Sequence, residues 1–224
     1  MKTKAKMLGI GMTERNVPKV MDGSKTQTRR IVSMKRAADC PAELPDDLLS
    51  SEILEWRQQD GQWFGLHEYR TLAIASRVHQ IGDRLYVKEA LQRHNNCAVY
   101  KCEYPAECVP VDCFADPEMA RAWSSDDGKP WKNKVIPARY MPRSAARTFI
   151  EITDVRCERV QDITIEDVQA EGIQSLFGKG SIDPTMLTRF IGLWNDTNGK
   201  DAWERNDWVF AYTFKLLAEA DLTA

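Results

Sequence analysis

The chain has 224 residues, of which 43% are hydrophobic and 29% are charged, a composition typical of a folded globular protein with one large or two small domains. Its formal net charge of -2 argues against a strongly basic nucleic-acid binder, although a local basic patch would still attract phosphate. No apolar run approaches the roughly 18 residues of a membrane-spanning helix. The apolar stretch near the N-terminus is too short for a signal peptide, so a cytoplasmic protein without membrane contact is expected.

The first predicted element is a short helix over residues 14–22. Val17, Val20 and Met21 have the spacing of one apolar helix face. Gly23 is placed to end this helix in the left-handed conformation that glycine adopts easily. The residues that follow, "SKTQTRRIV", are therefore expected to leave a helix end and to enter a loop or a strand.

Polar segments interrupt the regular elements in the first half of the chain. Residues 35–80 include an acidic and polar stretch with Pro41 and Pro45, and they are predicted to form an insertion rather than core, with a possible helix over 46–58. A turn signal opens residues 81–91 and is followed by the alternation of a half-buried strand. Residues 92–134 are again polar and rich in turn residues, so a second insertion is expected there.

The second half of the chain gives stronger signals. Residues 147–160 alternate as a strand does, and a helix is predicted to start after the N-cap Thr164 and to end near residue 171. A second helix over 184–198 begins after Asp183, and 207–217 reads as a strand. The order contains no strand–helix–strand alternation, which favours an α+β fold with a mostly antiparallel sheet or a small barrel.

Four of the six cysteines lie close together, spaced C-x4-C-x5-C-x4-C. Zinc sites of small modules prefer tighter pairs such as C-x2-C, so no metal and no cofactor is assigned. A cysteine-rich strand and loop is the simpler interpretation, and the metal question stays open for these residues: Cys97, Cys102, Cys108 and Cys113.

The stretch "GSKTQTRR" resembles the G-x-K-x-x-E-x-R signature of ASCH domains, which belong to the PUA-like superfamily. Gly23, Lys25 and Arg30 match this signature, and Thr28 stands where it has glutamate. Further stretches are similar to ASCH-type proteins carried by bacteriophages and prophages. In chain order these are "GDRLYVKEA", "YMPRSAARTFIEITDVRCERVQDI", "EGI", "LWNDTNG" and "WVFAYTFK", which together cover about half of the chain.

The resemblance implies a single ASCH domain over residues 1–224, with the insertions at 35–80 and 92–134. Its core would be a small, mostly antiparallel PUA-like β-barrel with helices packed at its mouth. It also implies a cleft that recognises RNA or a modified nucleobase or nucleoside.

The threonine at position 28 points to an alternative function within the same family. In small bacterial ASCH proteins that act as acetylcytidine amidohydrolases, a threonine follows the lysine by three positions and works with a glutamate from a later helix. Lys25, Thr28 and Glu171 look like that catalytic set, which would remove an acyl group from the exocyclic amine of cytidine. On the residues alone, an ordinary lysine–glutamate ion pair and a strand threonine explain the same pattern.

Basic and aromatic side chains could hold a nucleic-acid backbone and its bases. A solvated charged face is the alternative for the cations. A third interpretation is a phage accessory protein that binds a host protein through its insertions. The predicted nucleic-acid contacts are Arg29, Arg30, Lys88, Arg139, Arg143, Tyr86 and Tyr140.

Overall fold

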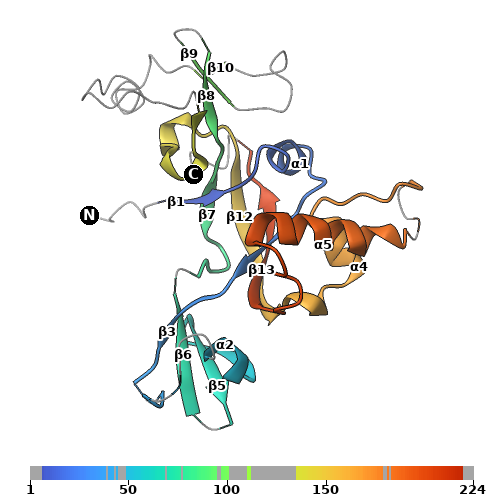
Figure 1. Cartoon of the computed structure of the whole chain (residues 1–224). Coiled ribbons are helices and arrows are strands. Elements are labelled where there is room, and N and C mark those ends of the chain that lie inside the picture. The colour runs from blue at the N-terminus through green and yellow to red at the C-terminus, as the bar shows by residue number, and fades with distance from the viewer. Residues whose placement is uncertain are drawn as a thin grey trace, which may run out of the picture. The chain divides into compact units, whose positions relative to one another are not determined.

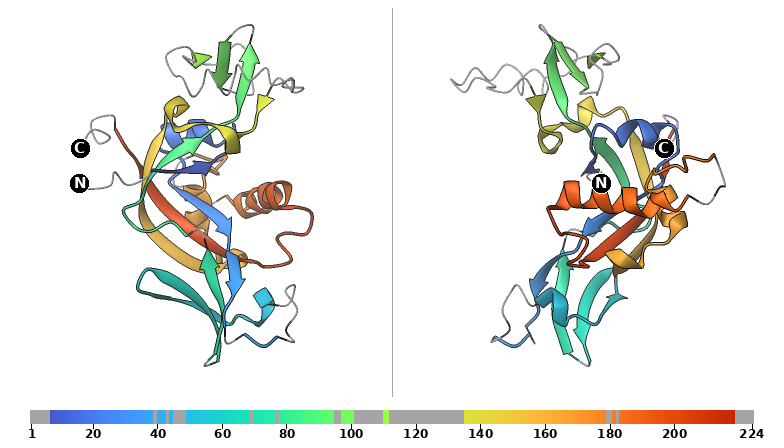
Figure 2. Two further views of the ribbon diagram at one scale, coloured as in Figure 1. Left: turned by 90° about the vertical axis from the view of Figure 1, so that its left-hand side faces the viewer. Right: turned by 45° about the vertical axis from the view of Figure 1, so that its right-hand side comes forward.

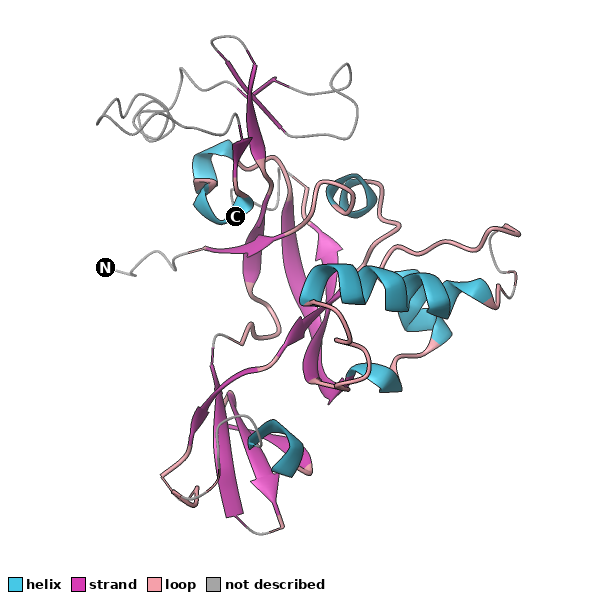
Figure 3. Ribbon diagram, viewed as in Figure 1, coloured by secondary structure: helices cyan, strands magenta, loops and turns pink. Residues whose placement is uncertain are grey.

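The structure is a computed structural model, and it describes residues 7–38, 40–42, 44, 49–68, 70–76, 78–94, 97–100, 110–111, 135–178, 181 and 183–218. These residues form a mixed α+β fold with mostly antiparallel sheets and few helices (Figure 3). The α+β class is therefore confirmed. Within the described ranges no sheet closes into a barrel, so the PUA-like barrel is not seen. The chain divides into two compact units, each described separately below.

The first unit contains residues 1–24, 83–151 and 215–224. Here β1 pairs in parallel with β7, and β7 pairs antiparallel with the start of β12. A second sheet has the antiparallel order β10-β9-β8-β11. The labelled elements of Figure 1 in this unit are β1 (Leu8–Gly11), α1 (Val17–Met21), β7 (Arg84–Lys88), β8 (Leu91–His94), β9 (Cys97–Tyr100) and β10 (Pro110–Val111), to which β11 (Val135–Ile136) and the 3-10 turns Ala138–Tyr140 and Arg143–Ala145 are added.

The second unit contains residues 25–82 and 152–214. One of its sheets has the order β12-β13-β2, and the other has the antiparallel order β3-β6-β5-β4. Strands β12 and β13 each extend a few residues into the first unit. The elements are β2 (Gln27–Ile31), β3 (Ser33–Arg36), α2 (Leu49–Glu52), β4 (Glu55–Gln59), β5 (Gln62–His67), β6 (Arg70–Ser76), β12 (Phe149–Arg159), the 3-10 turn Val160–Asp162, α4 (Ile165–Ala170), α5 (Thr185–Asn198) and β13 (Trp208–Leu216).

Helices α4 and α5 pack together against β13, an arrangement that can be followed in Figure 2. Val168 of α4, Phe190 and Trp194 of α5 and Val209 of β13 are buried in one apolar cluster. Phe190 and Trp194 are four residues apart, so they lie on one face of α5. Helix α4 therefore has a fixed position beside the sheet, which matters for the residues at its end.

Several predicted elements are confirmed with shorter bounds. The helix predicted over 14–22 is α1, and Gly23 follows it with φ of 76°. Thr164 caps α4 by accepting a hydrogen bond from Asp167 N at 3.2 Å. The helix predicted over 184–198 is α5, and the strand predicted over 147–160 is β12.

The helix predicted over 46–58 is wrong. Of its described residues, 49–58, the helix includes Leu49–Glu52 alone, and Glu55–Gln59 forms strand β4, which pairs with β5. The turn between them has positive φ at both Asp60 and Gly61, as in the hairpin turn that Asp-Gly favours. Residues 35–80 also contribute core, because Ile53, Trp56 and Trp63 are buried.

Candidate functional site

Strand β2 and the C-terminal end of α4 bring residues far apart in sequence together within the second unit. Thr26 N donates to Ala170 O at 2.8 Å, which ties the segment before β2 to the last turn of α4. Gly172 has φ of 87°, so the chain turns away directly after Glu171. Lys25 and Glu171 thus meet because a backbone hydrogen bond aligns their segments.

Lys25 and Glu171 form a buried ion pair. Lys25 Nζ lies 2.5 Å from Glu171 Oε2, and it also donates to Glu171 O at 2.9 Å. Lys25 is 2% exposed and Glu171 is 7% exposed. An ammonium group at a helix C-terminus satisfies a free carbonyl and complements the helix dipole.

Arg29 joins Glu171 to two more carboxylates. Its Nη1 donates to Gln27 Oε1 at 2.6 Å and to Glu171 Oε1 at 3.2 Å. Its Nη2 donates to Glu158 Oε1 at 2.7 Å and to Asp167 Oδ2 at 3.0 Å. Arg29 is 4% exposed, so the guanidinium is surrounded by its acceptors rather than by water.

Asp167 connects this group to a partly exposed arginine. Arg156 Nη2 donates to Asp167 Oδ1 at 2.8 Å, and Gln27 Nε2 donates to the same oxygen at 3.1 Å. Burial opposes the ionisation of Asp167, but these hydrogen bonds and the charge of Arg29 hold its pKa below the ordinary value. Cations and carboxylates balance in this charge cluster, which we define as Lys25, Arg29, Arg156, Glu158, Asp167 and Glu171, bridged by Gln27.

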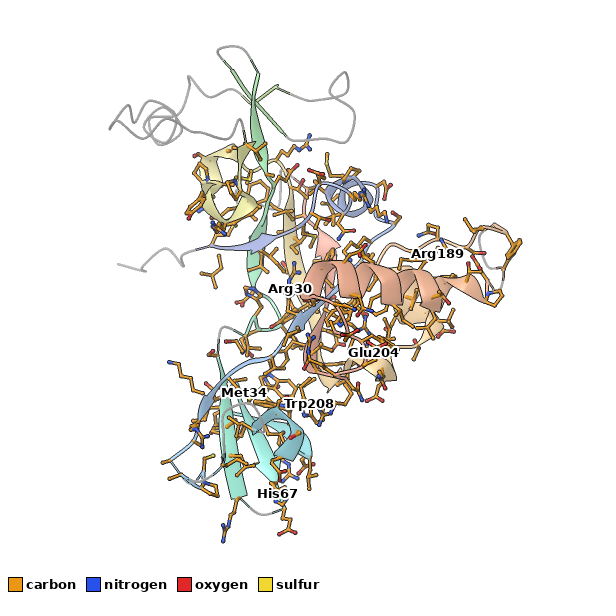
Figure 4. The ribbon with its side chains drawn as sticks, viewed as in Figure 1. Arg30, Met34, His67, Arg189, Glu204 and Trp208 are labelled. Carbon is orange, nitrogen blue, oxygen red and sulfur yellow. The ribbon has the colours of Figure 1, made fainter. Side chains whose placement is uncertain are left out.

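Thr28 and Arg30 point to the opposite face of β2. Successive strand residues alternate between faces, so Gln27 and Arg29 share the face of the charge cluster. Thr28 pairs with Tyr212 across the strands, and Arg30, which is labelled in Figure 4, pairs with Phe210. Burial lowers the pKa of the Arg30 guanidinium, while the charge of Glu171 acts in the other direction. The structure therefore joins Lys25 to Glu171 directly, and Thr28 lies beside them in β2 but on the other strand face.

Two predicted surface residues are not on the surface. Arg29 was expected to present its charge to a nucleic-acid backbone, and this placement is wrong because its guanidinium is buried among carboxylates. Tyr86 was expected to be available for stacking on a base, but it is only 9% exposed. Lys88 Nζ lies 5.5 Å from the centre of the Tyr86 ring and covers it.

The other predicted contacts in the first unit form an exposed cationic and aromatic surface. Tyr140 is 60% exposed, and the Arg139 guanidinium lies 4.7 Å from the centre of its ring. Lys88 Nζ donates to Arg139 O at 3.2 Å, and Arg143 is exposed in the next 3-10 turn. Residues 135–148 contain three arginines and no acidic residue. We call Lys88, Arg139, Tyr140 and Arg143 the Tyr140 surface.

A buried acidic residue of the first unit was missed. Glu89 is 2% exposed, and it accepts hydrogen bonds from Arg147 Nε at 3.0 Å and from Arg147 Nη2 at 2.7 Å. A signal was present in the sequence, because Glu89 continues the alternation that buries Leu85 and Val87. Arg147 is consequently paired with a carboxylate and adds little positive charge to the segment that contains Arg139 and Arg143.

Metal binding is not indicated by the described residues, where no group of three or more His, Cys, Asp or Glu side chains could hold an ion. The cysteines of the C-x4-C-x5-C-x4-C pattern lie outside the described residues, apart from the backbone of Cys97 in β9. Among the helices of the described ranges, none has the length and apolar character needed to cross a membrane.

Comparison with protein-family models, with curated proteins and with solved structures finds no match to this chain.

Proposed function

We propose that the chain is an ASCH-type protein with a PUA-like core that binds RNA or a modified nucleoside. One observation carries this proposal: Lys25 and Glu171, which the family resemblance assigns to one site, are 146 residues apart and in direct contact. The "SKTQTRR" segment and the end of the "VQAEGI" helix supply these two side chains. Burial of both charges gives a polar site of defined geometry beside β2.

The Tyr140 surface supports the RNA part of the proposal. An exposed aromatic ring can stack on a base of any sequence, and neighbouring arginines can contact phosphates. Residues 135–148 carry three arginines and no acid, so this segment is basic even though the whole chain has a net charge of -2. Single-stranded RNA, whose bases are accessible for stacking, fits this surface better than duplex RNA.

Binding of a labelled single-stranded RNA, with and without N4-acetylcytidine in its sequence, tests the proposal by fluorescence anisotropy at several salt concentrations. The double variant Arg139→Gln/Arg143→Gln is expected to weaken binding and to reduce the salt slope by about 0.7 for each lost phosphate contact. Tyr140→Ala is expected to weaken binding by ~1–3 kcal/mol without changing that slope, because stacking releases no counterions.

Arg57→Gln is the matched control. The Arg57 side chain is 67% exposed and belongs to the other unit, and its replacement removes one positive charge, as each of the two arginine replacements does. It is expected to leave both affinity and slope unchanged. Absence of binding by the wild-type protein at low salt, to either RNA, contradicts the proposal.

Amide hydrolysis is the second candidate function, and the short buried Lys25–Glu171 contact favours it. In this reaction the bond between the acyl carbon and the exocyclic nitrogen of cytidine breaks. Water supplies a hydroxyl to the acyl carbon and a proton to the amine, which gives cytidine and a carboxylic acid. Lys25 and Glu171 form a pair that can take up and return that proton. The family resemblance assigns the hydroxyl to Thr28, which lies in β2 on the face opposite to Gln27 and Arg29.

Incubation with N4-acetylcytidine and chromatography of the product tests this candidate. Lys25→Met is expected to slow cytidine release by about 10²–10⁴-fold, the usual contribution of acid–base catalysis. Thr28→Val is expected to slow it also, whereas Thr153→Val, at an exposed position of β12, should not. Hydrolysis is excluded if the wild type releases no cytidine from the nucleoside or from acetylated RNA.

A further inference from the structure

Arg29 lies between three carboxylates that would otherwise repel each other. Asp167 lies in the first turn of α4 and Glu171 is its C-cap residue, so the two are four residues apart and lie on one side of the helix. Glu158 approaches from β12, and its Oε1 lies 2.7 Å from Arg29 Nη2. Like charges at this spacing in a buried setting disfavour one another strongly.

The two arms of the guanidinium separate these acids. Nη1 contacts Glu171 Oε1, and Nη2 contacts both Asp167 and Glu158. Glu171 therefore uses one carboxylate oxygen for Arg29 and the other for Lys25, which fixes the orientation of its carboxylate plane. A lysine ammonium, as a point charge without a planar fork, could not reproduce this division.

Arg29 is itself held in place by a neutral residue of its own strand. Gln27 Oε1 accepts from Arg29 Nη1 at 2.6 Å, and Gln27 Nε2 donates to Asp167 Oδ1 at 3.1 Å and to Thr213 Oγ1 at 3.3 Å. Arg156 secures the same Asp167 oxygen from the outer side. Several side chains thus fix the positions of the Arg29 guanidinium and the Asp167 carboxylate in the ligand-free protein.

We propose that Arg29 is a positioning residue, which holds the Glu171 carboxylate with Oε2 facing Lys25. Its importance for binding or catalysis rests on the proposed function, but the positioning itself is a property of the free protein. Arg29 is too deeply buried to contact a ligand backbone, so it acts through Glu171.

The experiment follows the Lys25 ammonium group in nitrogen-15-labelled protein at fixed pH and temperature. Its resonance is assigned by its absence in Lys25→Met, and the exchange rate of its protons with water reports how firmly Glu171 holds it. Arg29→Gln is expected to raise this exchange rate about tenfold. Arg29→Lys, which keeps the charge and is the variant more certain to fold, is expected to raise it to an intermediate value.

Arg189→Gln is the control for general loosening, since Arg189 pairs with the buried Asp183 of the same unit and touches none of the cluster. It is expected to lower stability without changing the Lys25 signal. An unchanged Lys25 exchange rate in folded Arg29→Lys or Arg29→Gln overturns the positioning role. Affinities for N4-acetylcytidine and for the two labelled RNAs are measured on the same proteins. If the wild type binds none of them while Lys25 exchange responds to Arg29, the proposed function fails and the positioning role stands.

Discussion

Replacing Arg29 with methionine is expected to lower the free energy of unfolding by about 3–5 kcal/mol, because it leaves buried carboxylates without their cation. Arg29 is 4% exposed and bonds to Glu158, Asp167 and Glu171. Methionine fills a similar volume, so the expected loss is one of charge compensation more than of packing. Urea denaturation near neutral pH, followed by circular dichroism, measures the difference.

Arg57→Met is the matched control for this variant. Arg57 Nη2 lies 2.5 Å from Glu55 Oε1, a shorter contact than any made by Arg29 to a carboxylate, but both side chains are more than half exposed. Exposed pairs contribute ~0–1 kcal/mol, so Arg57→Met should have a small effect. Equal losses in the two variants would mean that burial does not determine the strength of the Arg29 contacts.

The pH dependence of the Arg29→Met deficit tests whether the lost stability comes from charge compensation. At low pH the Asp167 carboxylate becomes protonated, and its pKa is held below the ordinary value by Arg156, Gln27 and Arg29 against the opposing effect of burial. An acid whose pKa is lower in the folded state stabilises the fold above its unfolded pKa, and this stabilisation is lost as pH falls through the folded pKa. The stability deficit of Arg29→Met relative to wild type should therefore shrink as the solution is acidified.

The candidate site could be predicted in part. Lys25 and Glu171 were found because the first follows a helix-ending glycine, the second ends a capped helix, and the family resemblance joins the two. The sequence leaves open whether "KTQTRR" enters a loop or a strand, and only the alternation of a strand places residues 25, 27 and 29 together. This is why Arg29 was assigned to the surface.

The elements that cover the faces of a strand are harder to predict than the strand itself. The strand predicted over 207–217 is β13. Its alternation places Trp208, Phe210, Tyr212 and Phe214 on one face, and all four are buried. Val209 and Ala211 on the other face are also buried, because α4 and α5 cover that side. Alternation within one strand cannot show that both faces of the strand are covered, since the covering elements are distant in sequence.

The sheet of residues 33–76 illustrates a different limit. Its acidic and polar composition suggested an insertion without core, although the Asp60-Gly61 turn and the flanking tryptophans were signals of a hairpin. Trp56 and Trp63 are both buried and both pack against one residue of β13, Phe210. That contact links residues about 150 positions apart, and no local pattern predicts it.

Phe210→Ala is accordingly expected to cost about 3–5 kcal/mol of unfolding free energy, the usual loss for a buried phenylalanine. Phe210 is 3% exposed, and its ring centre lies 6.4 Å from that of Trp56, 5.3 Å from that of Trp63 and 6.0 Å from that of Tyr212. Phe177→Ala is the matched control, because Phe177 is 68% exposed. Its effect should stay within about 0.5 kcal/mol, as for most surface substitutions.

The location of the loss is as informative as its size. Ile53 O still accepts hydrogen bonds from Trp208 Nε1 at 3.1 Å and from Arg159 Nη2 at 3.3 Å, so polar contacts to the sheet of residues 33–76 remain in Phe210→Ala. The ring contacts of Phe210 to Trp56 and Trp63 are lost, however, and hydrogen exchange should accelerate in β5 and β6 more than in α5. Uniform acceleration across β5, β6 and α5 would show that the two sheets unfold as one cooperative unit, and Phe210 would then stabilise the whole unit instead of attaching one sheet to the other.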